Sequence, residues 1–187
     1  MKITMHQREV ALLESFLSKS ISYFEFGMGG STCLAAQLVR DRVSAVDSSL
    51  EWIEMVRDAM GYHPEKQIDL RHVDIGPLGG WGTPLSRKKQ EHLFHAYSLA
   101  IESNGSFDLC LVDGRFRVAS FLQALLMAES DTVLAMHDYR VRPSYHLVEE
   151  FARPISECQQ LTFFVRRSGM DRAKALRCAE LYRRDPA

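Results

Sequence analysis

The sequence lacks the features that mark secreted, metal-binding and membrane-spanning proteins. Its four cysteines show neither CxxC nor Cys/His ligand spacing, and two of them, Cys33 and Cys110, fall within apolar segments. No apolar run approaches the roughly eighteen residues of a membrane span. Polar residues also interrupt the amino end, where a signal peptide would need an apolar core. We therefore expect a cytoplasmic protein that is kept reduced and makes no membrane contact.

The sequence also lacks a surplus of either charge. The net charge is -1 and the pI is near 6.7, so no overall field would attract nucleic acid, which would need a local basic patch. A hydrophobic content of 46% over 187 residues suits one domain with a substantial core. We expect a single domain over 1–187, with an amino-terminal helix within 1–20 and a helical tail over 168–187. Thr4 and Gln7 predict a capping box at the start of the first helix.

The most informative stretch is SYFEFGMGGSTCLAAQL, which begins at Ser22. An apolar run ending at Phe26 predicts a short buried strand, and three glycines separate it from a segment with helical periodicity. Glycine lets the backbone turn tightly, and Ser31 or Thr32 can cap the helix while N–H groups remain free for an acidic ligand. This pattern indicates a nucleotide-type site, although the same turn occurs in α/β proteins that bind no ligand.

Acidic residues stand at the ends of the following predicted strands. RVSAVD ends at Asp47, about twenty residues beyond Gly27, where a carboxylate can accept both hydroxyls of a ribose. IDLRHVD ends at Asp74, FDLCLVDG contains Asp113, and a fifth strand ends in MHDY at His137 and its neighbours. Because ligands of open α/β sheets bind beyond the carboxyl ends of the strands, we expect these side chains to converge.

These motifs, in this order, resemble those of the class I S-adenosylmethionine-dependent methyltransferases over roughly Ser20 to Arg167. The VDGRFR and MHDY segments are similar in particular to those of small bacterial methyltransferase-like proteins. The resemblance implies an α/β, Rossmann-like three-layer sandwich, whose mostly parallel seven-stranded sheet has an antiparallel final strand and helices on both faces.

S-adenosylmethionine is the cofactor that the resemblance implies. The expected cofactor-binding residues are Glu25, Gly27, Met28, Gly29, Gly30, Ser31, Thr32, Asp47, Ser48, Asp74, Ile75 and Asp113. Among them, Asp74 takes the place of the carboxylate that recognises the adenine amino group in this family.

Methyl transfer from a sulfonium needs little activation, so catalysis is chiefly alignment of the acceptor, sometimes with a base. His137 and Asp113 are the predicted catalytic residues, with His137 as the base; a structural histidine is the alternative interpretation. Asp113, His137 and Asp138 could also hold a divalent cation, as in some related O-methyltransferases. We expect no metal to be required.

Basic and aromatic residues follow the same strand ends. Arginines at 115, 117, 140 and 142 predict capture of a carboxylate, sulfate or phosphate on the acceptor, although they could also form a solvent-exposed face. Trp81, in the glycine-rich segment 75–84, could close over the site or belong to a surface connection. The predicted substrate-binding residues are Arg115, Arg117, Trp81, Tyr139 and Arg140.

The sequence thus predicts an S-adenosylmethionine-dependent methyltransferase that acts by O- or N-methylation on a small, anionic acceptor. One alternative is a protein that binds the cofactor without catalysis. Another is an NAD(P)-dependent oxidoreductase, but its YxxxK motif occurs only at Tyr62 to Lys66, where Pro64 would disrupt the required helix. We expect a small-molecule partner and no nucleic acid, and we leave a homodimer open.

Overall fold

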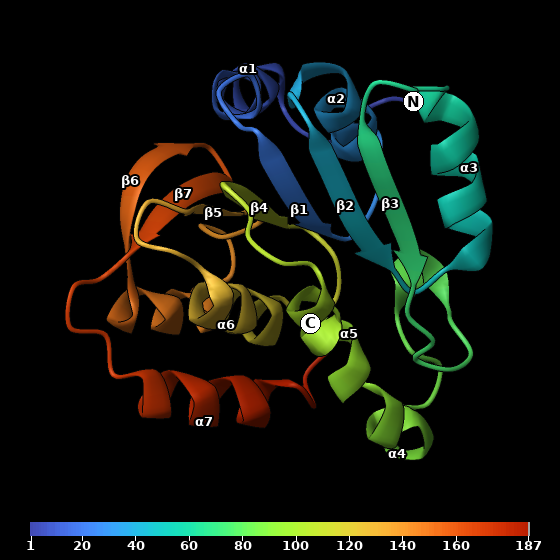
Figure 1. The fold of residues 1–187 in the computed structure, drawn as a ribbon. Coiled ribbons are helices and arrows are strands. Elements are labelled where there is room, and N and C mark those ends of the chain that lie inside the picture. The colour runs from blue at the N-terminus through green and yellow to red at the C-terminus, as the bar shows by residue number, and fades with distance from the viewer. Residues whose placement is uncertain (187) are drawn as a thin grey trace.

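Seven strands form one sheet in the order β3-β2-β1-β4-β5-β7-β6 in a computed structural model that describes residues 1–186 (Figure 1). The strands are β1 (Ser22–Phe26), β2 (Arg42–Asp47), β3 (Gln67–His72), β4 (Leu109–Val112), β5 (Val133–Met136), β6 (Ala152–Cys158) and β7 (Leu161–Arg166). Only β7 runs antiparallel to its neighbours, β5 and β6. The predicted sheet is confirmed, and its strand order reverses between β1 and β4.

Helices cover both faces of the sheet (Figure 1). The α-helices are α1 (Gln7–Leu17), α2 (Gly30–Leu38), α3 (Leu50–Met60), α4 (Arg87–Gln90), α5 (His95–Leu99), α6 (Arg117–Met127) and α7 (Arg172–Tyr182). The 3₁₀-helices are η1 (Gly80–Gly82), η2 (Glu91–Leu93), η3 (Ala100–Ser103) and η4 (Pro143–Glu150). Helices α1, α2 and α3 pack on one face, while α5 and α6 pack on the other, with α7 outside α6.

Alternation along the central strands divides the core into these two layers. Phe24 and Phe26 of β1 point into the layer built around α6, while Tyr23 points into the layer of α1 and α2. Every residue of β4 is buried, as expected for a central parallel strand. Strands β1 and β4 pair in parallel up to Phe26 and Val112, so their carboxyl ends lie side by side.

Helix α1 begins differently from the prediction. Its cap is His6, whose Nδ1 accepts a hydrogen bond from the Arg8 amide at 3.2 Å, and the Glu9 carboxylate accepts one from the His6 amide at 2.7 Å. The predicted capping box of Thr4 and Gln7 is wrong. The physical reason is that Glu9 is buried, so the carboxylate that closes the box also has partners elsewhere in the fold.

Two regions outside the central strands complete the fold. Strands β6 and β7 form an antiparallel hairpin at the edge of the sheet, so the expected antiparallel final strand is confirmed. The segment after Ser86 is divided into α4, η2, α5 and η3. No helix among residues 1–186 is both long and apolar enough to cross a membrane.

Candidate functional site

The candidate site begins where the loop after β1 touches the loop after β4. Gly27 has a φ of +88°, and a Cβ on it would overlap the backbone of Gly114. A Cβ on Gly114 would in turn lie 2.7 Å from the Gly27 amide nitrogen and would overlap the Tyr97 hydroxyl. Two glycines therefore allow these loops to meet at the carboxyl edge of the sheet, where ligands of such folds bind.

The glycine loop leads directly into α2. Thr32 Oγ1 accepts a hydrogen bond from the Gly29 amide at 2.9 Å, which orders the start of the helix. A Cβ on Gly30 would lie 2.7 Å from the Lys2 carbonyl oxygen, so the amino-terminal segment packs against this turn. The first amides of a helix lack partners within it and can bind an anionic group such as a carboxylate.

Glu25 lies beneath this turn and is fully buried. Its Oε1 accepts from Ser31 Oγ at 2.5 Å and its Oε2 from Thr32 Oγ1 at 2.7 Å, so the carboxyl group ties β1 to α2. Burial raises the pKa of Glu25 to about 8, although both hydroxyls lower it. Glu25 is thus close to the expected methionine end of the cofactor and is protonated in much of the neutral pH range.

Asp47 connects the glycine loop to the start of α3. Its two oxygens accept from the Met28 amide at 3.0 Å and from the Ser49 amide at 2.9 Å. Burial raises the pKa of Asp47, and the Ser49, Met28 and Ser48 amides and the positive charge of Arg115 lower it. The structure therefore places Asp47 beside the loop, as its predicted role as a ribose ligand requires.

The predicted adenine end is more exposed. Strand β3 ends at His72, and the exposed Asp74 accepts a hydrogen bond from the Gly76 amide at 2.7 Å, while Ile75 is buried. The Gln90 side chain holds the carbonyl oxygens of Ile75 at 2.6 Å and Pro77 at 3.0 Å.

The segment after Ile75 returns toward the end of β2. A Cβ on Gly82 would lie 3.3 Å from Ser48 Oγ, so the tip of the segment borders the turn that carries Asp47. Trp81, at this tip, is 87% exposed and has a φ of +59°, a left-handed conformation that is unusual for a bulky residue. Its place beside the site is compatible with the predicted contact to cofactor or substrate.

Arg117 is predicted to bind the substrate, but its side chain does not lie at the surface of the site. Its side chain is buried, Nη1 donates to the His137 carbonyl at 2.6 Å, and the guanidinium also contacts Asp113 Oδ1 at 2.9 Å and Asp138 Oδ2 at 3.0 Å. Its Nε donates to the Gly114 carbonyl oxygen at 3.1 Å. Because carbonyl oxygens at strand ends need donors, the arginine is drawn inward and joins the ends of β4 and β5 instead of facing a substrate.

Two other predicted substrate residues also have protein partners. Tyr139 is buried and donates its hydroxyl to Glu149 at 2.7 Å, and Arg140 pairs with Glu157 at 3.0 Å on an exposed surface. The structure does not bring either residue together with Arg115.

Arg115 and Arg142 are the two predicted arginines that remain to be placed. Arg115 is half-buried, and burial lowers its pKa. Its positive charge acts to lower the pKa values of Asp47 and Tyr97. Its Nη1 contacts the Pro186 carbonyl oxygen at 3.5 Å. Arg142 lies over the Tyr145 ring, 5.6 Å from its centroid, and is 3.6 Å from Asp138.

His137 is held between two carboxylates. Its Nδ1 lies 3.2 Å from Asp113 Oδ1, and its buried Nε2 lies 3.7 Å from Glu9 Oε2 without a hydrogen-bond partner in the described chain. Burial lowers the pKa of His137, but Asp113, Asp138 and Glu9 outweigh burial and raise the pKa above its ordinary value. The ring thus links Glu9 of α1 to Asp113 at the end of β4.

Glu9 is the residue of this cluster that sequence reasoning missed. It is 2% exposed, and its Oε1 accepts from the Gln160 amide at 2.7 Å in the β6–β7 turn. The one available signal was an acidic residue three positions after His6 at a helix start, which identifies a capping role but no long-range partner.

The ligand atoms of Asp113, His137 and Asp138 lie within 4.8 Å of one another, so a divalent cation has to be considered. Arg117 already contacts both carboxylates, at 2.9 and 3.0 Å. A divalent cation there would face the guanidinium at close range and would have to displace it from both carboxylates. This donor set does not fit a divalent cation.

Comparison with solved structures identifies the fold. A methyltransferase-like protein from Silicibacter pomeroyi is 29% identical, with a TM-score of 0.87, and the match covers 99% of this chain and 98% of that one. The N-methyltransferase NodS from Bradyrhizobium japonicum, in complex with S-adenosyl-L-homocysteine, is 13% identical over 87% of this chain and 88% of its own, with a TM-score of 0.56. An rRNA methylase from Streptococcus thermophilus is 13% identical over 89% and 100%, with a TM-score of 0.52.

These matches confirm the resemblance that the ordered motifs indicate. The last two matches establish the fold alone. One is named as an rRNA methylase and the other only as an N-methyltransferase, so the fold does not determine what is methylated. No protein-family model matches the chain, and no curated protein sequence matches it.

The raised pKa values of Glu25 and His137 predict that the free energy of unfolding falls as the pH rises from about 5 to about 8. Glu25 has a pKa of about 8 when folded and an ordinary value near 4.5, so between these the folded chain holds a proton that the unfolded chain has released. The stabilising contribution of protonated His137 is complete below about pH 6.5 and is lost as the pH rises through its higher folded pKa.

Urea unfolding measured across this pH range checks the prediction. Glu25→Gln should flatten the profile by about 1–4 kcal/mol, because each pKa unit corresponds to about 1.4 kcal/mol. Glu14→Gln, on the exposed side of α1, serves as the control and should leave the profile unchanged. A Glu25→Gln profile as steep as that of the wild type would show that Glu25 has no raised pKa.

Proposed function

We propose that this chain, which has the fold of the class I S-adenosylmethionine-dependent methyltransferases, binds S-adenosylmethionine and transfers its methyl group to a small anionic acceptor by O- or N-methylation. The observation that carries the proposal is the meeting of three strand-end loops at one edge. These loops contain Gly27, Asp47 and Asp113, and the first two are joined by the Met28–Asp47 hydrogen bond.

The cofactor's methionine end would lie at residues 27–32, where the start of α2 can bind its carboxylate. Its ribose hydroxyls would donate hydrogen bonds to the Asp47 carboxylate. They would either replace the Met28 and Ser49 amides that now donate to this carboxylate or share its oxygens with them. The adenine would extend toward Asp74 and Ile75, with the Trp81 segment over it.

S-adenosylmethionine supplies an electrophilic methyl group, so the chain's task is to align an acceptor lone pair with it. We assign His137 a positioning role, because its Nδ1 faces Asp113 and its Nε2 is buried against Glu9. Asp113 is the more exposed partner and has a second oxygen that could take a proton from the acceptor. Arg117 fixes the other oxygen of Asp113 and so orients the carboxylate.

The acceptor's negative charge would be bound by Arg115 and Arg142 alone. The predicted partners Arg117 and Arg140 pair closely with carboxylates within the fold, at 2.9 and 3.0 Å, whereas Arg142 lies 3.6 Å from Asp138 and Arg115 contacts the Pro186 carbonyl oxygen at 3.5 Å. Two arginines on neighbouring turns suit one carboxylate or phosphate, whereas a nucleic acid would need positive charge over a broad face.

Calorimetry with S-adenosylhomocysteine and with NAD tests the cofactor assignment. We expect S-adenosylhomocysteine to bind and NAD not to bind. Asp47→Ala should weaken binding by about 1–3 kcal/mol through the loss of charge-assisted hydrogen bonds. Asp58→Ala, which removes an exposed carboxylate from α3, is the matched control. Equal affinities of wild type and Asp47→Ala would remove Asp47 from the site.

Substitution of Arg115 tests the acceptor assignment. Arg115→Lys keeps the charge but loses the bidentate fork, so transfer of a labelled methyl group to anionic small molecules should fall by about tenfold or more. S-adenosylhomocysteine affinity should not change. Arg153→Lys, at an exposed position of β6, should behave as the wild type. Undiminished methylation by Arg115→Lys would show that Arg115 does not bind the acceptor.

A further inference from the structure

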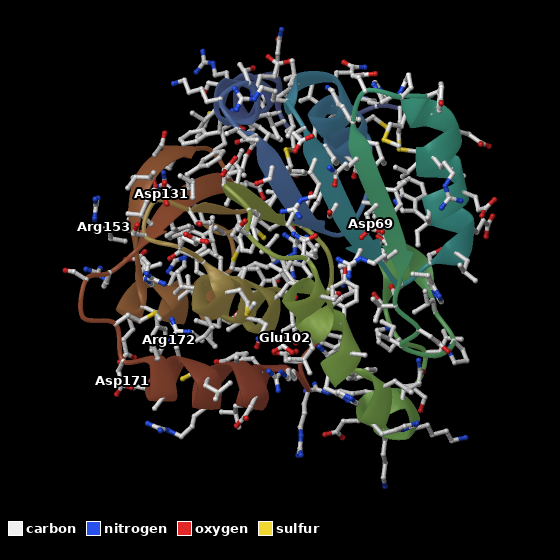
Figure 2. All side chains as sticks on the ribbon, in the orientation of Figure 1. Asp69, Glu102, Asp131, Arg153, Asp171 and Arg172 are labelled. Carbon is white, nitrogen blue, oxygen red and sulfur yellow. The ribbon has the colours of Figure 1, made fainter. Side chains whose placement is uncertain are left out.

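One face of β2 and β3 is polar and has no α-helix over it, although the 3₁₀-helix η3 contacts it through Arg71. Ser44 of β2 pairs in register with Asp69 of β3, and Arg42 pairs with Gln67, so these four residues share a face with Arg71. In Figure 1 no labelled helix crosses this face, which is turned toward the viewer, and Figure 2 shows Asp69 on it. Parallel sheets ordinarily bury both faces beneath helices. The exposed polar face of β2 and β3 therefore departs from the usual arrangement of a parallel sheet.

A cavity of about 280 Å³ lies on this face. Ser44 and Asp69 belong to its sheet side, Ser103 and Asn104 contribute from η3 and the residue after it, and Arg42 and Gln67 come from the amino ends of the strands. It differs from the candidate cofactor site, because Arg42 and Gln67 begin their strands, whereas Asp47 ends β2 and Gly27 and Asp113 directly follow β1 and β4.

Two side chains that line the cavity are buried and unsatisfied. Ser44 is 1% exposed and Asn104 is 8% exposed, yet Ser44 Oγ and Asn104 Nδ2 have no hydrogen-bond partner within residues 1–186. A buried polar group without a partner is costly, so such groups in native structures normally meet a ligand or an ordered water. The Asn104 amide nitrogen can only donate, and therefore requires an acceptor.

The charges around the cavity also favour an acceptor. Arg42 donates to the carbonyl oxygens of Asn104, at 2.9 Å, and Ser106, which fixes its positive charge at one end. Arg71 pairs with Asp69 at 3.0 Å and donates to Ser103 Oγ at 2.6 Å, and its buried Nη2 has no partner in the described part of the chain. Arg42 thus binds two backbone carbonyl oxygens and Arg71 pairs with Asp69, while the groups without a hydrogen-bond partner include two nitrogen donors and a hydroxyl.

We propose that this cavity is a second small-molecule site, which binds the carboxylate or phosphate group of a ligand other than the cofactor. The oxyanion accepts hydrogen bonds from Ser44 Oγ and Asn104 Nδ2 and is attracted by the nearby arginines. Asp69, which is half-exposed, opposes the anion and restricts the site to ligands whose remaining part donates to it through a hydroxyl or an ammonium group.

Titration with inorganic phosphate and with acetate tests the proposal. Heteronuclear NMR at constant ionic strength follows the side-chain NH₂ signals of Asn104, which are assigned by their absence in Asn104→Ala. Saturating S-adenosylhomocysteine is added in parallel samples, so that binding at the start of α2 is separated from binding here. We expect a saturable shift of the Asn104 signals with at least one probe, whether or not S-adenosylhomocysteine is present or binds.

Substitutions of the lining residues test which side chains contact the anion. Ser44→Ala should weaken binding of that probe by about fivefold, the effect of one lost hydrogen bond, and should not lower the free energy of unfolding, because the hydroxyl has no protein partner. Asp69→Asn should tighten binding. Arg153→Ala, which removes an exposed cation from β6, should change nothing. Phosphate binding alone would indicate a phosphate ester, and acetate binding alone a carboxylic acid.

Two results would overturn the proposal. The first is an Asn104 signal that neither probe shifts, since the cavity would then hold water only. The second is a shift of equal affinity in wild type and Ser44→Ala, which would place the anion elsewhere on the surface.

Discussion

The architecture of the candidate site depends on one close contact, that between Gly27 and Gly114. These residues follow β1 and β4, the strands between which the sheet order reverses, and a Cβ on either would overlap the opposite loop. Their contact brings Asp113 beside the loop that also binds Asp47 through the Met28 amide. A crevice of this kind is where α/β sheets bind ligands, so the absence of two side chains creates the place for a cofactor.

A network of buried charged residues supports the contact between the Gly27 and Gly114 loops. Arg117 joins the ends of β4 and β5, and His137 links Asp113 to Glu9 of α1. Removing one member of such a network leaves other charges buried without a partner, which costs more than the pair contributes. The amino-terminal helix is thereby part of the site's support, although it lies far from Asp113 and His137 in sequence.

The sequence allowed most of the sheet and the strand-end residues to be predicted, because apolar runs, glycines and terminal aspartates are local signals. Asp47 and Asp113 lie where their positions after β2 and β4 indicate. Arg117 and Glu9 could not be placed, because their partners are fixed only by folding. Arg117 donates to the carbonyl oxygen of His137, directly after β5, and Glu9 accepts a hydrogen bond from the Gln160 amide. Hydrogen bonds between residues so far apart in the sequence produce no spacing pattern from which they could be predicted.

A crystal structure of the chain with S-adenosylhomocysteine tests the central claim most directly. The account predicts density for the ligand at the carboxyl edge of β1, β2 and β4, with its carboxylate at the start of α2 and its ribose hydroxyls on Asp47. Gly27 and Gly114 should remain in contact beneath it. Ligand bound away from the Gly27 loop, or a complex in which Asp47 contacts only protein amides, would contradict the account.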